Sequence, residues 1–340
     1  MRHVKRISFR FLCLLLSGCG AIQDPRAQDA PDLLPPAIRS TRALGTDEVE
    51  IVFDEAALIP PESLSIQPAL SMEPPAEAAL AVIIQCGPQT PGTLYMLSAS
   101  ARDERGNSVT FAVEIYGFNP NVPRILINEL ITQGSDTHPD LVELKALSDG
   151  DMGGLVIYQG GPGDYTDRLV FPSFSVSQGA FILVHFKPSG SPEEMDETVD
   201  MAVSGGLDAS VSAFDFWVSG GTGLSGNNGV ISLYDRPGGE IVDGILYSNR
   251  TSDSDSQYRG FGTASTLKRA DELVAAGGWR IAGEKAAPED AVSPEESTAT
   301  RSICRSSASA DTDGREDWHI VPTKGSTFGA ENSDAVYVPK

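Results

Sequence analysis

The chain has 340 residues, of which 40% are hydrophobic and 21% are charged, so it can bury a core and general disorder is excluded. Its net charge of −22 argues against nucleic-acid binding and against adhesion to anionic membrane surfaces. Such a charge suits cationic partners or divalent cations, although plain solubility explains it more simply. With 34 glycines and 23 prolines among short apolar runs, the composition predicts β-structure with frequent turns in about two domains.

The first nineteen residues have the pattern of an export signal. Basic residues between Arg2 and Arg10 precede the apolar run 11–16, which is far shorter than the roughly 20 residues of a membrane span. The next residues, Leu16-Ser17-Gly18-Cys19, resemble the bacterial lipobox. That resemblance implies a signal peptide over 1–19, acylation of Cys19 and a lipid anchor outside the cytoplasm. An ordinary secretory signal that contains a cysteine is the alternative.

The mature chain is expected to begin with a tether. Cleavage before Cys19 removes four basic residues and no acidic ones, which makes the net charge −26. Residues 20–36 are rich in proline and predict an extended tether. Gly20 stands where some bacteria use Asp to retain lipoproteins in the inner membrane, which favours the outer membrane, on its periplasmic or its surface side. Cys86 and Cys304 then remain, and unpaired buried thiols are favoured over a disulfide between them.

Residues 37–118 predict a small β-sandwich. Val49, Ile51 and Phe53 alternate along one strand, and further short strands are expected at 64–66, 81–84, 95–99 and 111–115. The segments Val52-Phe53-Asp54-Glu55, Pro91-Gly92-Thr93-Leu94-Tyr95 and 103–107 resemble those of bacterial Ig-like domains. The resemblance implies a spacer or binding module without chemistry of its own.

A second β-sandwich is expected over 124–332, after the linker 119–123 and before a short tail, 333–340. Seven or more short apolar runs between residues 124 and 247 are separated by Gly, Pro and Asp turns. The fold class predicted is therefore all-β, with two Ig-like β-sandwich domains in tandem.

The second body resembles a lamin-tail domain, an Ig-like module also found in exported bacterial proteins. The resembling segments are 127–130, 141–144, 229–235, 239–243, 301–305, 311–318 and 329–332. Two departures are Lys145-Ala146, where the family has Asn, and the long acidic loop 188–224. A charged excursion over 283–298 predicts a mobile loop. Residues 265–269 and 279–281 echo 302–305 and 318–320, which is either a duplication or a coincidence of turn chemistry.

Paired carboxylates on neighbouring strands are the strongest candidate for chemistry. Glu129 and Glu143 could act in acid–base catalysis. However, Glu129 shares a face with apolar neighbours and the family resemblance implies a structural role for both acids. The sequence has no nucleophile elbow, P-loop or dinucleotide fingerprint. It therefore predicts a protein that is not an enzyme and that has no organic cofactor.

A weak metal site is conceivable in the acidic turn that contains Asp311, Asp313 and Asp317. Oxygen ligands beside Gly314 suit Ca²⁺, but the spacing of a calcium loop and its final Glu are missing. His138, His185 and His319 do not have the spacing of zinc ligands.

An aromatic run in the long acidic loop offers a candidate binding surface. Phe214, Phe216 and Trp217 would contact a protein or polysaccharide partner if exposed, and would cover the sandwich as an edge strand if buried. Burial is favoured, because large aromatic side chains are mostly buried.

The function predicted is that of a membrane-anchored, exported lipoprotein that binds or scaffolds at the cell envelope without catalysis. The partner is expected to be a protein or polysaccharide and not nucleic acid. A structural spacer, or an accessory module that recruits a separate hydrolase or nuclease, is the alternative.

Overall fold

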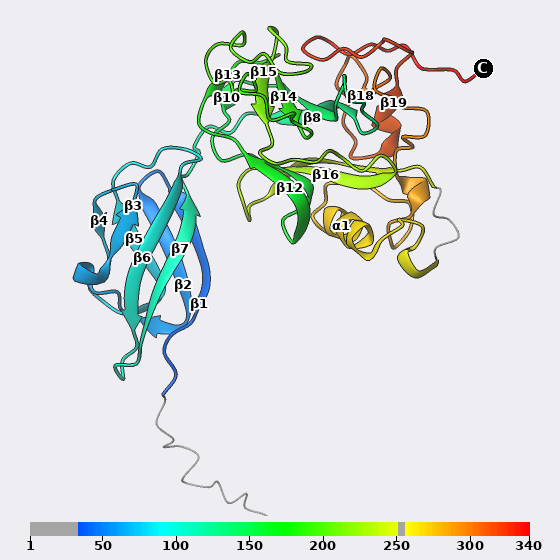
Figure 1. The fold of residues 1–340 in the computed structure, drawn as a ribbon. Helices are drawn as coiled ribbons and strands as arrows, with labels where there is room; N and C mark the ends of the chain where they lie inside the picture. Colours follow the sequence, from blue (N-terminus) through cyan, green and yellow to red (C-terminus); the bar gives the residue numbers. More distant parts are fainter. Residues whose placement is uncertain (1–32, 251–255) are drawn as a thin grey trace, which may run out of the picture.

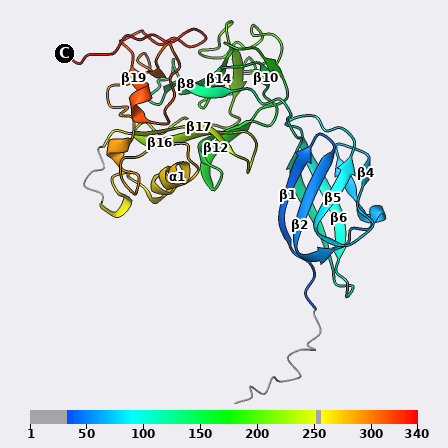
Figure 2. The same ribbon diagram turned by 180° about the vertical axis from the view of Figure 1, so that it is seen from behind.

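The computed structural model describes residues 33–250 and 256–340. The expected signal peptide, Cys19 and residues 20–32 of the expected tether lie outside the described residues. Figure 1 shows two bodies joined at one end, and Figure 2 shows the same arrangement from behind.

The first body is a two-sheet β-sandwich. One sheet has the order β1-β2-β5-β4 and the other has the order β3-β6-β7. Alternate residues such as Val49, Ile51 and Phe53 point into a shared apolar core, as the period-two pattern predicts. The strands are β1 (Ile38–Gly45), β2 (Glu48–Ala57), β3 (Ser65–Gln67), β4 (Met72–Glu73), β5 (Ala79–Cys86), β6 (Leu94–Arg102) and β7 (Ser108–Tyr116), with a 3₁₀ turn η1 at Pro61–Ser63.

The second body packs a four-stranded sheet on a six-stranded sheet. The first has the order β12-β11-β16-β17, and the second has the order β15-β14-β9-β8-β18-β19, with only β14 and β15 parallel. The strands are β8 (Ile125–Ile131), β9 (Leu141–Ala146), β10 (Gly150–Asp151), β11 (Val156–Gly161), β12 (Asp164–Val170), β13 (Ser175–Val176), β14 (Phe181–His185), β15 (Phe214–Trp217), β16 (Asn228–Tyr234), β17 (Ile241–Ser248), β18 (Ile303–Arg305) and β19 (Trp318–Ile320). The all-β sandwich prediction is thus confirmed.

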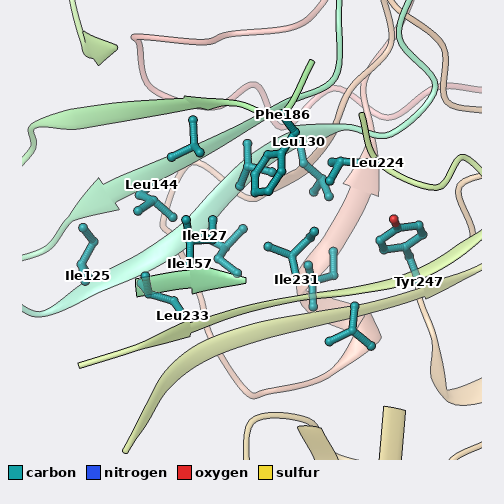
Figure 3. Close-up of a cluster of buried hydrophobic side chains, with 14 of the residues drawn as sticks. Ile125, Ile127, Leu130, Leu144, Ile157, Phe186, Leu224, Ile231, Leu233 and Tyr247 are labelled. Carbon is teal, nitrogen blue, oxygen red and sulfur yellow. The ribbon is translucent and has the colours of Figure 1, made fainter. Parts of the chain in front are cut away.

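The core of the second body lies between its two sheets. Ile127 and Leu144 from one sheet face Ile157, Ile231 and Leu233 from the other (Figure 3). All five side chains are fully buried. Each such side chain contributes about 1.5–3 kcal/mol when removed from water, so this interface between sheets holds the body together.

One α-helix among the described residues corrects the sequence analysis. α1 (Ala264–Ala275) covers the outer face of β11, β16 and β17, and it contains residues 265–269, which echo 302–305 in sequence. Thr263 caps the helix by accepting a hydrogen bond from Thr266 N, and the segment is rich in Ala, Leu and other good helix formers. Because residues 265–269 are helical and β18 is a strand, the echo is a coincidence and not a duplication.

The expected mobile excursion over 283–298 is instead packed. Ala286, Ala291 and Val292 are buried against the core, and Val292 N donates to Leu246 O of β17. The segment contains the 3₁₀ turn η3 (Pro288–Asp290), and two further turns, η2 (Ser256–Tyr258) and η4 (Arg315–Asp317), lie nearby in sequence. This packing is explained by small apolar residues that lie between the charged ones. Their contribution is hidden when hydropathy is averaged over the segment.

The two bodies meet through a close backbone approach. Gly92, with φ of 68°, lies so near Gly154 that an added Cβ would be 2.3 Å from its nitrogen. Asn119 also donates through Nδ2 to the carbonyls of Asp151 and Gly153. The linker side chain therefore fixes the junction. Among the described residues, no helix is both long and apolar enough to cross a bilayer.

Candidate functional site

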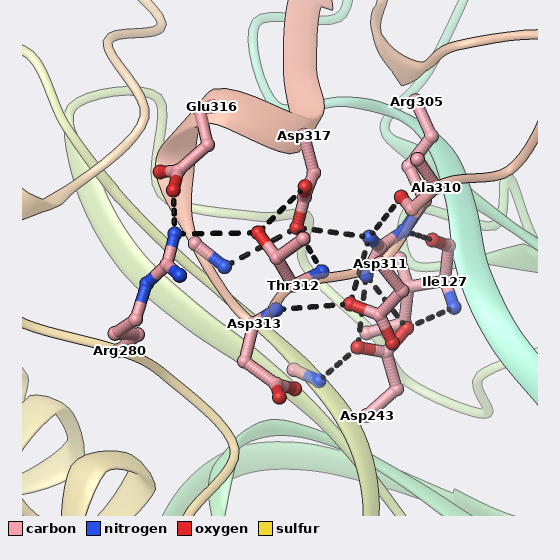
Figure 4. Close-up of polar contacts among 12 residues, drawn as sticks. Ile127, Asp243, Arg280, Arg305, Ala310, Asp311, Thr312, Asp313, Glu316 and Asp317 are labelled. Atoms are coloured by element: carbon pink, nitrogen blue, oxygen red, sulfur yellow. Dashed lines mark hydrogen bonds and ion pairs between the residues drawn. The ribbon is translucent and has the colours of Figure 1, made fainter.

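A buried arginine joins the two sheets of the second body. The register of β8 shifts between Ile127, which pairs with Leu144 of β9, and Glu129, so Asn128 is the extra residue of a bulge that follows Ile127. Arg305 Nε donates to Ile127 O at 2.8 Å, and Ile127 N donates to Asp243 Oδ2 at 2.6 Å. Arg305 Nη2 also donates to both oxygens of Asp243, at 3.0 and 3.1 Å (Figure 4). The side chains of Arg305 and Asp243 are both fully buried. This ion pair therefore supplies hydrogen-bond partners for the backbone of Ile127 inside the protein.

The acidic turn that suggested a metal site surrounds this arginine. Arg305 Nη1 lies 3.0 Å from Asp311 and 3.5 Å from Asp317. Asp317 also accepts hydrogen bonds from Thr312 N and Gly314 N, which shapes the turn. The carboxylates able to surround one cation are those of Asp243, Asp311 and Asp313, so Asp317 is not part of that group. The guanidinium already neutralises Asp243 and Asp311, and the turn is best described as a cradle for Arg305.

Glu129 and Glu143, the candidate catalytic pair, lie opposite one another on β8 and β9 and are fully buried. Glu129 accepts hydrogen bonds from Ser302 Oγ and from Thr327 N and Oγ1, the last at 2.7 Å. Glu143 accepts from Asn128 Nδ2 at 2.7 Å and from Gly329 N at 2.6 Å. The donors all belong to this chain, so the pair fastens the 326–333 segment to the sheet.

Two asparagines complete that fastening. Asn332 Nδ2 donates to Asn128 O, Asn128 Oδ1 and Arg305 O at 3.1, 3.1 and 2.9 Å. Asn128 Nδ2 in turn donates to Asn332 Oδ1 at 2.9 Å. We call Asn128, Glu129, Glu143, Thr327 and Asn332 the C-terminal latch. Segments far apart in the sequence that carried the lamin-tail resemblance thus meet in one buried network.

Burial dominates the electrostatics of this network. Desolvation raises the pKa of Glu129 above its usual value, against the opposing effect of its hydroxyl donors. Desolvation and the neighbouring Glu129 raise the pKa of Glu143 well above 4.5. Desolvation likewise raises the pKa of Asp243 to about 7, despite its contact with Arg305. The paired glutamates therefore hold a proton more tightly in the folded state than in the unfolded chain.

The aromatic run 214–217 forms β15 at the edge of the six-stranded sheet. Phe216 is fully buried, Trp217 is 8% exposed and Phe214 is half-buried. Phe216 packs on Phe171 and Phe174. A partner cannot reach Phe216 or Trp217 in this conformation, so the exposed interpretation is replaced by the buried one for these two side chains.

A buried histidine anchors the insertion that precedes β15. His185 Nε2 lies 2.7 Å from Asp215 Oδ1, with both side chains fully buried, and its ring stacks on Trp217 at 3.7 Å. His138 and His319 lie elsewhere, beside Asp208 and beside Cys304 and Ser333 O respectively. The three histidines are therefore not brought together. Cys86 and Cys304 are free thiols, and desolvation raises the pKa of both.

The insertion itself, residues 188–213, is held by its own carboxylates. Glu197 is 2% exposed and accepts from Val203 N, Ser204 N and Asp215 N at 2.9, 2.7 and 2.9 Å. Glu194 accepts from the backbone nitrogens of Ser189 and Gly190. Acidic residues expected to be simply solvated therefore organise the 188–213 loop, with Glu197 fully inside it.

The same loop presents apolar side chains to solvent. Between residues 195 and 211, every fourth position carries an exposed Met, Val or Leu. Val199 is 89% exposed and Val211 is 76% exposed. We call this group the exposed apolar set: Met195, Val199, Val203, Leu207 and Val211. These five are the large apolar side chains that the loop exposes to solvent.

A cavity of about 500 Å³ opens beside this loop. Asp208, Ala209 and Ser210 of the loop line it together with residues from β8, the 138 turn, the 299–300 turn and the C-terminal segment. His138 Nδ1 lies 2.9 Å from Asp208 Oδ1, and Ser326 Oγ is buried without a hydrogen-bond partner among the described residues. Residues from five parts of the chain thus line one cavity beside the 188–213 loop.

The sequence analysis did not find either the arginine cradle or the exposed apolar set. The four-residue spacing of apolar positions in a loop otherwise made of acidic and small residues was a usable signal for the set. Nothing in the sequence indicated that Asp243 would meet Arg305, because that contact depends on the β8 bulge.

The fold and network define an Ig-like β-sandwich closed by a buried polar latch. A family model described as "TP_1001_2nd: protein second domain" matches residues 123–320, more than half of the chain, and the chain belongs to this family. A protein of Treponema pallidum (strain Nichols), described as an uncharacterized protein, is 28% identical over 159 residues. This match covers 46% of the chain and 40% of the relative, so the chain spans about two fifths of that relative's length.

Proposed function

We propose that the protein is a non-enzymatic binding module of the cell envelope, exported and anchored in a membrane by a lipid on Cys19. The observation that carries the binding role is the exposed apolar set, whose side chains lie at the surface of the described part of the chain. The lipobox-like sequence supports the anchor, and the outer membrane is the proposed location. Identification of the second body as a lamin-tail domain belongs to the same proposal.

The use of the polar side chains supports binding over catalysis. The two glutamates expected to be available for acid–base chemistry accept hydrogen bonds from their own chain and are fully buried. Asp243, Asp311 and Asp317 are similarly engaged by Arg305. In contrast, the loop end offers exposed apolar groups beside a cavity, which is the usual composition of a recognition surface.

Photocross-linking in the cells that make the protein tests the binding role. A photoreactive residue at position 199 should form a discrete cross-linked species, while the same residue at Leu80 in β5, which is 55% exposed, should not. Equal cross-linking at both positions, or none at position 199, would contradict a specific contact through the 188–213 loop.

The anchor is tested separately. Incorporation of a labelled fatty acid should occur in the natural chain and disappear in Cys19→Ser, which should also leave the membrane fraction. A label that persists in Cys19→Ser, or membrane association that does not depend on Cys19, would refute the anchor and leave the binding proposal standing.

A further inference from the structure

The charge around the exposed apolar set restricts what can bind it. The 188–213 loop contains six carboxylates and no Lys or Arg. Of these six, Glu193, Asp196 and Asp200 are exposed. Asp208 is half-buried beside His138. Apolar groups on this loop therefore lie within a strongly negative field.

Hydrogen bonds hold two arms of the loop, around Glu193 and Gly205, beside each other. Gly205 N donates to Glu193 O at 2.9 Å, and Glu197 bridges to Val203 N and Ser204 N across the loop. Trp217 Nε1 donates to Ser204 Oγ at 3.0 Å and ties the loop to β15. Met195 and Val203 are thus on adjacent arms, and Val199 is at the turn between them. Because the backbone is fixed by buried groups, a partner would find the apolar side chains already ordered.

Three occupants are possible in principle, and the charges distinguish them. A second copy would place the exposed Glu193, Asp196 and Asp200 near their own counterparts, and like charges at an interface oppose association. A bilayer that contains anionic lipid is repelled by the same field. A polypeptide segment with apolar side chains flanked by Lys or Arg can cover the apolar groups of the loop and also pair with its carboxylates.

We infer that the exposed apolar set docks a basic, apolar polypeptide segment of a partner protein, with Val199 and Val211 buried on binding and the loop carboxylates facing the partner's Lys or Arg side chains. This inference rests on the proposed function and specifies the chemistry of the partner. Binding should be fast and sensitive to salt, because exposed charges are screened beyond about 8 Å at physiological ionic strength.

The test uses the full chain in detergent and three synthetic peptides that share one set of apolar residues. The polar positions of the peptides are all Lys, all Gln or all Glu, and binding is measured by calorimetry. The Lys peptide should bind, the Gln peptide should bind more weakly and the Glu peptide should not bind. Raising the salt concentration should weaken the Lys peptide most.

A matched pair of valine variants separates the loop from general charge attraction. Val199→Ser with Val211→Ser leaves every charge in place and should weaken binding of the Lys peptide at least tenfold, since two valine side chains are no longer removed from water on binding. Val336→Ser with Val338→Ser changes two valines of the C-terminal tail, 58% and 77% exposed, and should leave binding unchanged. Equal affinity of the two double variants would overturn the inference.

The remaining outcomes each identify a different occupant. All three peptides could bind equally, and the Val199→Ser with Val211→Ser variant could abolish that binding. This result would keep the proposed function and refute the basic partner. Valine-dependent binding of phosphatidylcholine vesicles would identify a lipid surface, and a valine-dependent dimer in sedimentation would identify a second copy. Failure of all three peptides to bind would also overturn the inference.

Discussion

The two bodies achieve the same architecture with different interiors. The core of the first body is apolar, with Gln89 and Asp103 the buried polar residues of its described part. The second body buries Glu129, Glu143, His185, Asp243 and Arg305 in addition to its apolar core. The difference implies that the first body is tolerant of pH and of conservative substitution, whereas the second depends on the identity of individual polar residues.

The largest effect that can test this contrast is expected from Arg305→Met. Removal of the guanidinium leaves Asp243 buried without its partner and frees the carbonyl of Ile127, which costs about 3–5 kcal/mol of unfolding free energy. All three tryptophans, Trp217, Trp279 and Trp318, belong to the second body, so fluorescence-monitored urea unfolding isolates this loss. An unchanged fluorescence midpoint would show that the cradle does not stabilise the body.

The matching change in the first body is Leu97→Ala. Leu97 is fully buried in the apolar core, and its truncation should cost about 2–5 kcal/mol through lost burial and a residual cavity. Calorimetry should show a lower melting temperature for the first body, while the tryptophan transition stays in place. A shift of both transitions would mean that the junction at Gly92 and Asn119 couples the two bodies.

A smaller loss is expected from Asn332→Ala, which opens the C-terminal latch. The substitution removes the hydrogen bonds that Asn332 Nδ2 donates to Asn128 and to Arg305 O, and the one that Asn332 Oδ1 accepts from Asn128, for a cost of about 2 kcal/mol. Limited proteolysis should then cleave within the 326–333 segment, which the natural chain protects. Asn119→Ala, at the junction between bodies, is a control that should not expose this segment.

The sequence revealed the features of this contrast that depend on neighbouring residues, and it did not reveal those that depend on contacts between residues far apart in the chain. Alternation along β2 predicted the first sandwich, and short apolar runs between turns predicted the second, because both patterns are local. The same alternation could not show that Asp243 and Arg305, 62 positions apart, would meet at a bulge. The aromatic strand at 214–217 was recognisable as an edge strand, whereas the spacing of apolar residues on the preceding loop did not show whether they would be buried or exposed.

The smallest effect, and the one that most sharpens the comparison, is a difference in pH dependence. Glu143 has a folded-state pKa raised well above 4.5, so between 4.5 and that raised value the folded chain binds more protons than the unfolded one. The unfolding free energy of the second body should therefore fall as pH rises through this window, by up to about 1.4 kcal/mol per pH unit for one proton. Glu143→Gln removes the contribution of this carboxyl and should make the slope shallower, while the raised pKa values of Glu129 and Asp243 preserve part of it. The variant also carries the constant cost of one mismatched hydrogen bond to Asn128 or Gly329. The transition of the first body, which has no such pair, supplies the internal control in the same calorimetric scan.

A natural chain and a Glu143→Gln chain with parallel stability curves would show that the paired glutamates do not share a proton in the folded state, and the C-terminal latch would then be held by fully charged carboxylates.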